Sequence, residues 1–277
     1  MTISAIVPTC GRPEMLRRAI ESILAQTLLP QEIIVVNDTD QPCDLNVSHL
    51  SASHVKVVSN CRTKGASGAR NCGADSARHE FLAFLDDDDQ WLPQYLEKVS
   101  YLALMHEANV ICTDFLACSV NGSDLPEKQA PESFSASNFF YHNDGMRGSN
   151  LFISRRLYHD LGGFDETLDS LNDLDLAIRI SDMKSIVRYV PLHQRLVRFN
   201  NHDGQRLSTP CSQAKCNGVR QFYEKYYSRM TEPQRTHYRQ WVRTMWSVDE
   251  YGNIVGSPHD AADGTSKSRS ITTQKTR

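Results

Sequence analysis

The sequence lacks long apolar runs and lacks the marks of a secreted protein. No stretch reaches the roughly 18 consecutive apolar residues that a membrane-spanning helix needs. The opening residues "MTISAIVPTC" have neither the basic start nor the apolar segment of a signal peptide. We therefore expect a soluble, cytoplasmic protein.

Two further absences exclude other classes of protein. None of the eight cysteines forms a C-x-x-C pair, so a zinc or thioredoxin-type site lacks its spacing. A disulfide framework is unusual for 277 residues without a secretion signal, and we expect free thiols. A formal net charge of -3 gives no sign of nucleic-acid affinity, so we expect no nucleic-acid partner.

Apolar strand-like segments and helical patterns alternate up to about Ser119. The strand-like segments are "ISAIVPT", "EIIVVND", "HVKVVSN", "EFLAFLD" and "NVICTDFLAC". The helical patterns between them are "RPEMLRRAIESILAQT", "GASGARNCGADSARH" and "LPQYLEKVSYLALMHE". Fully apolar strands separated by helices predict an α/β fold, a Rossmann-like, mostly parallel sheet with helices on both faces.

The second half of the chain is less regular. Residues from Val120 to Asn143 are loop-rich, and "GSNLFISR", "SIVRYV" and "QRLVRFNN" are strand-like around a short helix in "LNDLDLAIRISD". Ser212 to Val248 is helical in pattern, and the polar tail after it predicts disorder. The expected organisation is a domain over 1–210, a helical extension over 211–250 and a disordered tail over 251–277.

Polar residues stand where the predicted strands end. They are Thr9, Asp38, Asn60 and the run Asp86–Asp89. Ligands of parallel α/β sheets bind at the carboxyl ends of the strands, so these residues are expected to converge on one ligand-binding edge.

Four adjacent aspartates have two explanations. They could form a solvated acidic turn, or they could surround a divalent cation, which accepts carboxylate oxygens and relieves their repulsion. Because they follow a buried strand directly, at least one carboxylate should face the ligand edge. Alternate residues of an extended strand end share one side, which makes Asp86 and Asp88 the expected pair.

Taken together, the segments resemble family 2 glycosyltransferases of the GT-A fold. The matching segments are "AIVPTCGRPEMLRRAIESILAQT", "EIIVVND", "NCRTKGASGARNCGADSARHEFLAFLDDDDQWLP", "GSNLFISRRLYHDLGGFDETL" and "NDLDLAIRI", in the family order over residues 3 to 205. The resemblance implies transfer of a sugar, with inversion, from a nucleotide-diphosphate sugar (a UDP-sugar is favoured) to an acceptor hydroxyl. It also implies a divalent cation, Mn²⁺ or Mg²⁺, as cofactor.

The aspartate run matches the D-x-D motif of that family. The resemblance makes Asp88 the main metal ligand and places Asp86 on the metal or the ribose. Asp87 is grouped with the nucleotide-sugar-binding residues.

Other nucleotide-binding positions also follow from the resemblance. Asp38 matches the aspartate that holds the nucleobase, although a turn or helix cap would also explain it. Pro8, Thr9 and Arg12 match the loop beneath the nucleoside. Arg70, in "GARN", matches a position that lines the nucleotide site; the alternative is a surface arginine of a helix.

The expected general base is Asp173, which matches the aspartate of the family's "ED" motif. An inverting displacement needs a carboxylate that takes the proton of the acceptor hydroxyl. Asn172 stands where the family usually has glutamate, and Asp175 should point elsewhere on the helix. The alternative for Asp173 is an acid that stabilises the helix N-terminus.

The segment "RFNNHDGQRLS" resembles the place where relatives carry a histidine near the metal. His202 fits that place and is the third expected metal ligand. His193, which precedes a predicted strand, is interpreted as structural.

Two alternative functions remain open at this point. A sugar-phosphate nucleotidyltransferase shares the nucleotide-binding sheet, but "VPTCGRPE" has one glycine where those enzymes have a glycine-rich loop. A non-catalytic relative would not be expected to keep Asp38, Asp86, Asp88 and Asp173 together.

The expected acceptor is a glycan or a lipid-linked sugar, in bacterial surface polysaccharide or glycolipid synthesis. The C-terminal helices are basic with interleaved aromatic residues. Peripheral contact with the inner face of a membrane would explain this pattern, and so would a solvated basic face over an aromatic core.

Overall fold

The structure is a computed structural model that describes residues 1–43, 54–118, 129–143, 145–200 and 209–256. The chain divides into two compact units. The first, here the sheet unit, comprises Met1–Phe139, Asn143–Glu166 and Asn172–Gly204. The second, here the C-terminal unit, comprises Phe140–His142, Thr167–Leu171 and Gln205–Arg277. Two short segments before residue 210 therefore group with the second unit.

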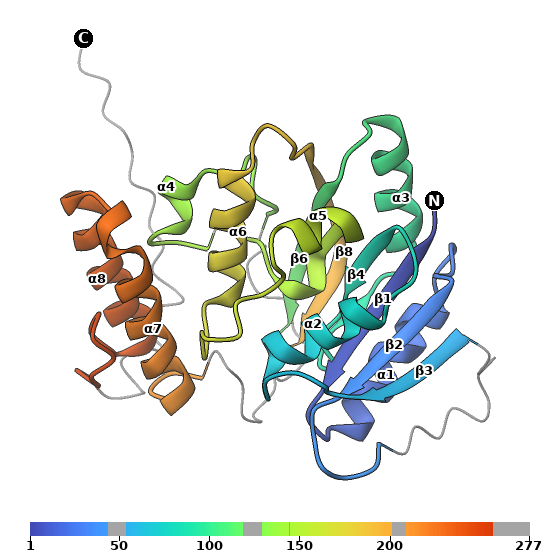
Figure 1. Cartoon of the computed structure of the whole chain (residues 1–277), viewed down its shortest axis with the longest axis horizontal. Coiled ribbons are helices and arrows are strands. Elements are labelled where there is room, and N and C mark those ends of the chain that lie inside the picture. The colour runs from blue at the N-terminus through green and yellow to red at the C-terminus, as the bar shows by residue number, and fades with distance from the viewer. Residues whose placement is uncertain (44–53, 119–128, 144, 201–208, 257–277) are drawn as a thin grey trace. The chain divides into compact units, whose positions relative to one another are not determined.

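Among the described residues, the strands form one sheet in the order β3-β2-β1-β4-β7-β6-β8-β5 (Figure 1). The strands are β1 Ile3–Thr9, β2 Glu32–Asn37, β3 Val55–Ser59, β4 Phe81–Phe84, β5 Gln90–Trp91, β6 Val110–Cys118, β7 Leu151–Ser154 and β8 Tyr189–Asn200. β1 to β4 pair in parallel, as the sequence predicts. β7 lies between β4 and β6 and is antiparallel to both, and β5 is antiparallel to β8.

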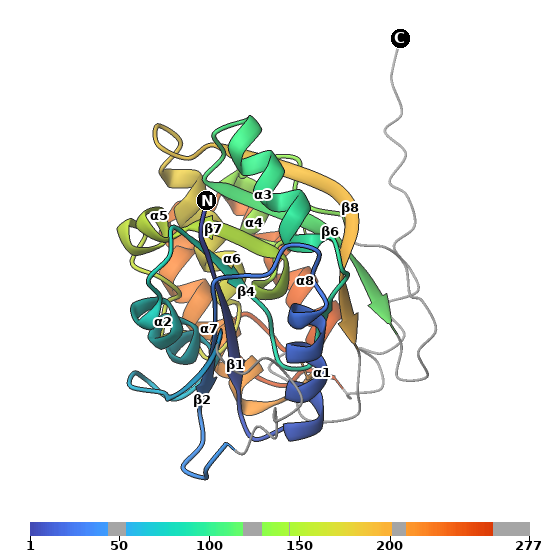
Figure 2. The ribbon, with the colours of Figure 1, turned by 90° about the vertical axis from the view of Figure 1, so that its right-hand side faces the viewer.

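Helices cover both faces of the sheet (Figure 2). In the sheet unit they are α1 Pro13–Leu24, α2 Ala66–Ser76, α3 Tyr95–Met105, α4 Ala136–Phe139, α5 Arg155–Asp160 and α6 Asn172–Asp182. Side chains alternate along β1, so Ile3, Ala5 and Val7 join one core with residues of α1 and α3. Ile6 points the other way, toward α2.

Gly73 explains the close approach of α2 to the sheet. A Cβ atom there would lie 2.4 Å from Ile6 Cγ2 and 3.1 Å from Val36 Cγ2. A larger residue would overpack this contact. Gly73 thus allows α2 to lie directly on β1 and β2.

The strand ends on which the site depends are level with one another. Thr9 of β1 pairs with Asn37 of β2, and Asn37 pairs with Ser59 of β3. Asp38 and Asn60 follow these ends immediately, and the aspartate run follows β4. The polar strand ends therefore meet at one edge, as predicted.

β8 is one strand, where the sequence predicts two. It pairs in parallel with β6 along the whole length of β6. The register of the β6–β8 pairing shifts on both sides of Asp114. This irregularity accommodates the polar residues of β8 that separate the two predicted strands, so that β8 continues as a single strand.

The C-terminal unit contains α7 Gln213–Tyr226, a 3₁₀ turn at Tyr227–Arg229 and α8 Glu232–Trp246. Its interior is aromatic: Phe222, Tyr223 and Tyr238 stack and are buried, and the Tyr238 hydroxyl donates to the Val219 carbonyl at 2.7 Å. Arg239 pairs with Glu232 and Glu250. These contacts favour the solvated basic face over an aromatic core.

No helix in the described part of the chain has the length and apolar character to cross a bilayer.

Candidate functional site

The four aspartates after β4 do not share one environment. Carboxylate oxygens of Asp86, Asp88 and Asp89 lie within 4.8 Å of one another. Asp87 is buried and binds Thr9 and Arg12 instead. The chain turns here, because the Asp89 amide donates to the Asp86 carbonyl at 3.0 Å. The predicted pairing of alternate residues assumed an extended chain, and the turn adds Asp89 to the pair.

Asp87 joins the loop after β1 to the loop after β4. The Thr9 hydroxyl donates to Asp87 Oδ2 at 2.6 Å. The Arg12 guanidinium donates to both Asp87 oxygens, and its Nη1 also donates to Asp88 Oδ2 at 3.2 Å. Burial lowers the pKa of Arg12, but the charges of Asp87 and Asp88 outweigh burial and raise it overall. Arg12 is thus a permanent cation beside the aspartates.

Asp86 binds a second buried arginine. Arg70 Nη2 donates to Asp86 Oδ1 at 2.5 Å, and the guanidinium lies 5.0 Å from the centre of the Phe164 ring. Only 6% of Arg70 is exposed, which excludes the alternative of a surface helix arginine. Gly148 makes room for it, because a Cβ atom there would lie 3.0 Å from two guanidinium nitrogens.

Asp89 was missed by the sequence analysis, and later segments of the chain hold it in place. The Ser149 hydroxyl donates to Asp89 Oδ2 at 2.6 Å and accepts the Asp86 amide at 3.1 Å. The Asn200 amide donates to Asp89 Oδ1 at 3.2 Å, and its side-chain amide donates to the Asp88 carbonyl at 2.9 Å. The sequence signal was the fourth aspartate in the run.

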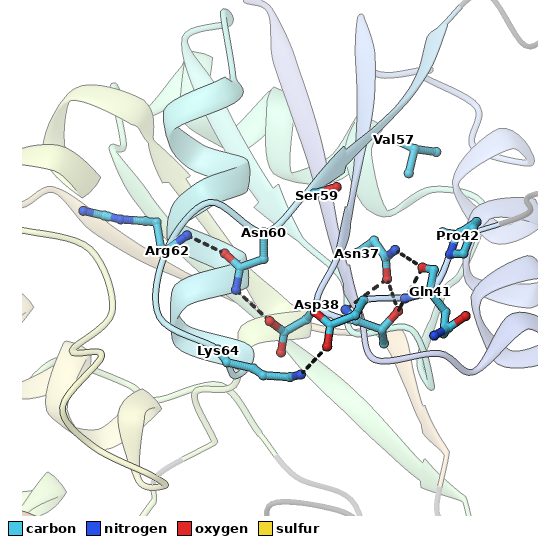
Figure 3. A pocket seen from close by; sticks show the side chains of 12 residues that line it. Asn37, Asp38, Gln41, Pro42, Val57, Ser59, Asn60, Arg62 and Lys64 are labelled. Carbon is cyan, nitrogen blue, oxygen red and sulfur yellow. Dashed lines mark hydrogen bonds and ion pairs between the residues drawn. The ribbon is translucent and has the colours of Figure 1, made fainter.

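A polar pocket of about 610 Å³ opens at the ends of β2 and β3 (Figure 3). Asp38 lies in its wall, accepting from Asn60 Nδ2 at 2.7 Å and from the Gly65 amide at 2.8 Å. The second bond satisfies an amide at the start of α2, so Asp38 both lines the pocket and caps the helix. Arg62 and Lys64 supply positive charge in the same wall.

The other predicted nucleotide-binding residues lie outside this pocket. Pro8 is buried within β1, where it pairs with Val36. Thr9 and Arg12 contact Asp87, as described above, and are not among the residues that line the pocket.

The two acids of α6 have different surroundings. Asp175 is fully buried and accepts from Arg179 Nε and Nη2 at 2.9 and 2.6 Å. Asp173 is partly exposed. Burial lowers the pKa of Arg70, but the charges of Asp86 and then Asp173 raise it overall. Asp173 thus acts electrostatically on the arginine that holds Asp86, whereas Asp175 is held within the helix.

The predicted third metal ligand, His202, lies outside the described residues. His193 interacts with carboxylates of Asp114 and Glu132, 3.1 and 3.3 Å from its ring nitrogens. This pairing agrees with the structural role expected for His193.

The cluster of three aspartate carboxylates fits a divalent cation. Asp86, Asp88 and Asp89 offer clustered hard oxygen atoms, the ligands that Mg²⁺ and Mn²⁺ prefer. Four carboxylates against the two guanidinium groups of Arg12 and Arg70 leave two formal negative charges, which one divalent cation would balance.

The chain is similar to proteins of one family along much of its length. An "Uncharacterized glycosyltransferase" of Haemophilus influenzae is 27% identical over 190 residues, which are 68% of this chain and 64% of that protein. A UDP-Glc:alpha-D-GlcNAc-diphosphoundecaprenol beta-1,3-glucosyltransferase of Escherichia coli, WfgD, is 35% identical over 96 residues, 34% of this chain and 38% of that protein. The chain thus spans less than two thirds of either relative.

Solved structures share the fold. Staphylococcus aureus TarS (residues 1–349), crystallised with UDP-GlcNAc, superposes with a TM-score of 0.63 at 18% identity, covering 88% of this chain and 72% of that one. The fold is GT-A. The sequence model described as "Glycosyl transferase family 2" matches residues 4–162, more than half of the chain. The protein therefore belongs to glycosyl transferase family 2.

Proposed function

We propose that the protein transfers a sugar, with inversion, from a nucleotide-diphosphate sugar to an acceptor hydroxyl, with Mn²⁺ or Mg²⁺ as cofactor. The observation that carries the proposal is the cluster formed by Asp86, Asp88 and Asp89 at the same sheet edge as the pocket around Asp38. Family membership supports the same reaction. It leaves the nucleotidyltransferase alternative without support.

The pocket at β2 and β3 is the proposed site of the nucleoside. Its carboxylate, amide and carbonyl groups match a base and a ribose, both of which present donors and acceptors. A UDP-sugar is favoured because WfgD is named for UDP-Glc and TarS was crystallised with UDP-GlcNAc. Asp38, fixed by Asn60 and Gly65, would accept from the base.

Asp86, Asp88 and Asp89 would hold the cation, which would neutralise the leaving diphosphate as a Lewis acid. Arg12 and Arg70 fix the turn that presents these carboxylates. Asp87 then has a supporting role, because its carboxylate is occupied by Thr9 and Arg12.

Asp173 is the proposed general base. Its partial exposure leaves it accessible to an acceptor, and its charge acts on Arg70, which binds Asp86. The carboxylate would take the proton of the acceptor hydroxyl as the new glycosidic bond forms.

The proposed acceptor is a glycan or a lipid-linked sugar of bacterial surface polysaccharide or glycolipid synthesis. Support comes from WfgD, whose name specifies a sugar on diphosphoundecaprenol.

The test is calorimetric titration of UDP in the presence of Mn²⁺. Asp88→Asn should weaken UDP binding by at least about tenfold, because it removes a charged ligand of the cation that bridges to the diphosphate. The matched control is Asp160→Asn, since Asp160 is a half-exposed acid at the end of α5 that pairs with Arg156, and neither residue lines the pocket. Equal UDP affinity in wild type and Asp88→Asn would contradict the proposed cation site and favour the alternative of an acidic turn that binds no cation.

A further inference from the structure

Arg147 has an environment that ordinary packing does not explain. Its guanidinium carbon lies 5.0 Å from the centre of the Phe199 ring and 5.7 Å from that of Phe115. Its Nε atom is buried and has no hydrogen-bond partner. Across the described residues, no carboxylate or other acceptor binds the guanidinium.

The buried Nε of Arg147 lacks a hydrogen-bond acceptor. A buried donor without an acceptor loses its hydration and gains nothing in return, and the two rings compensate for only part of that loss. The other arginines near the aspartates, Arg12 and Arg70, both have carboxylate partners. Arg147 thus offers a planar fork of donors, one of them buried and without a partner, that suits an oxyanion.

The backbone around Arg147 is firmly held beside the acidic turn. Its amide donates to Asn150 Oδ1 at 2.8 Å. Ser149, two residues on, bonds to both Asp86 and Asp89. Phe199 directly precedes Asn200, which bonds to Asp88 and Asp89. The backbone that carries Arg147 therefore adjoins the acidic turn.

We infer that Arg147 binds a phosphate group of the acceptor substrate. The inference rests on the proposed function and names its acceptor class: a hydroxyl compound that carries a phosphate or diphosphate near the reacting sugar. A bidentate pair between guanidinium and phosphate would satisfy the orphaned donor and orient the acceptor at the site.

The order of the strands assigns the phosphate to the acceptor rather than to the donor. The nucleoside pocket lies at β2 and β3, and the acidic turn follows β4. Arg147 precedes β7, and its two rings come from β6 and β8, on the other side of β4 in the sheet. A donor that extends from the pocket to the cation would end at the acidic turn, and Arg147 lies beyond it.

The experiment separates the two phosphate sources. In the donor arm, UDP with Mn²⁺ is titrated into wild type, Arg147→Gln, Arg147→Lys and Arg156→Gln. In the acceptor arm, decyl diphosphate, with decanol as the uncharged comparison, is titrated into the same proteins saturated with UDP and Mn²⁺. Arg156→Gln is the charge-matched control, because the Arg156 side chain is 93% exposed on α5.

We expect Arg147→Gln to weaken decyl diphosphate binding by about 10- to 100-fold, the effect of losing a charged hydrogen-bonded pair. UDP affinity should change by less than about twofold, within the range of an uninvolved surface substitution. Arg147→Lys, which keeps the charge but not the fork, should lie between the two. Decanol binding should not respond to any of the variants.

Unchanged decyl diphosphate affinity in Arg147→Gln would overturn the inference and leave a packing role. A loss confined to UDP would also overturn it, because the arginine would then hold the donor. If wild type failed to bind UDP, the proposed function would fail on its own, and decyl diphosphate titrated without UDP would still test Arg147. Melting curves show whether each variant is folded, and Arg147→Lys carries the comparison if Arg147→Gln is not.

Discussion

Single carboxylates of this protein differ more in their surroundings than in their chemistry. Asp175 is fully buried against Arg179, whose Nη1 also donates to the Leu161 carbonyl at 2.6 Å. This arrangement connects α6 to the end of α5. Asp173, two residues earlier, is partly exposed. One helix thus carries a structural acid and a candidate base, and which is which depends on the face of the helix.

Substitutions at these two positions should separate catalysis from stability. Asp173→Asn should leave UDP binding and the melting temperature nearly unchanged while turnover falls by about 10²- to 10⁴-fold, the usual loss without a general base. Asp175→Asn should lower the free energy of unfolding by about 1–3 kcal/mol, because Arg179 loses its charged partner. Kinetics and denaturant unfolding of both variants check this. A stable, inactive Asp175→Asn enzyme beside an active Asp173→Asn enzyme would mean that the base was assigned two residues too early.

At the level of helices and strands, the sequence predicted those elements that depend on local patterns of residues. The apolar alternation up to Ser119 predicted β1 to β4 and their helices, and the polar residues after the strands predicted that these strand ends meet at one edge of the sheet. Partner choice between distant segments has no local signal, so the antiparallel insertion of β7 between β4 and β6 was not predictable. Asp89 was missed for a related reason, because its place depends on a turn held by Ser149 and Asn200.

The pairing of β6 with β8 should contribute to stability in a pH-dependent way. The hydrogen bond to Asp114 raises the pKa of His193, and the charge of Glu132 acts in the same direction. A raised pKa in the folded state means that the stabilisation is complete below the unfolded pKa of about 6.5 and disappears as pH rises through the folded pKa.

His193→Gln should therefore reduce stability under acidic conditions only. We expect a loss of up to about 1 kcal/mol near pH 5.5, the usual value of a partly exposed ion pair, and almost none near pH 8.5. Urea unfolding at both pH values measures it, with His106→Gln, an exposed site without an ion pair in the described structure, as the control. A loss that is equal at both pH values would assign the effect to packing.

For the whole molecule, ligand binding should connect the pocket to the acidic turn. A nucleoside diphosphate that lies in the pocket reaches the turn through its phosphates, and three clustered carboxylates repel those phosphates unless a cation lies between. The nucleotide and the cation should therefore bind together, and each should bind more weakly when the other is absent.

Thermal unfolding tests this dependence directly. UDP with Mn²⁺ at a hundredfold excess over the dissociation constant should stabilise the folded state by about 2.7 kcal/mol and raise the melting temperature accordingly. UDP with a chelator should give little or no shift. An equally large shift in chelator would show that the phosphates do not reach the cation.

The contacts of Asn200 with Asp88 and Asp89 also bear on the order of events during translation. Asp89 emerges from the ribosome 111 residues ahead of Asn200, whose backbone amide binds it. β1 to β4 can pair as soon as they are made, so the nascent chain would have its nucleoside pocket well before the acidic turn is supported. We expect truncated translation products that end before β8 to bind metal poorly.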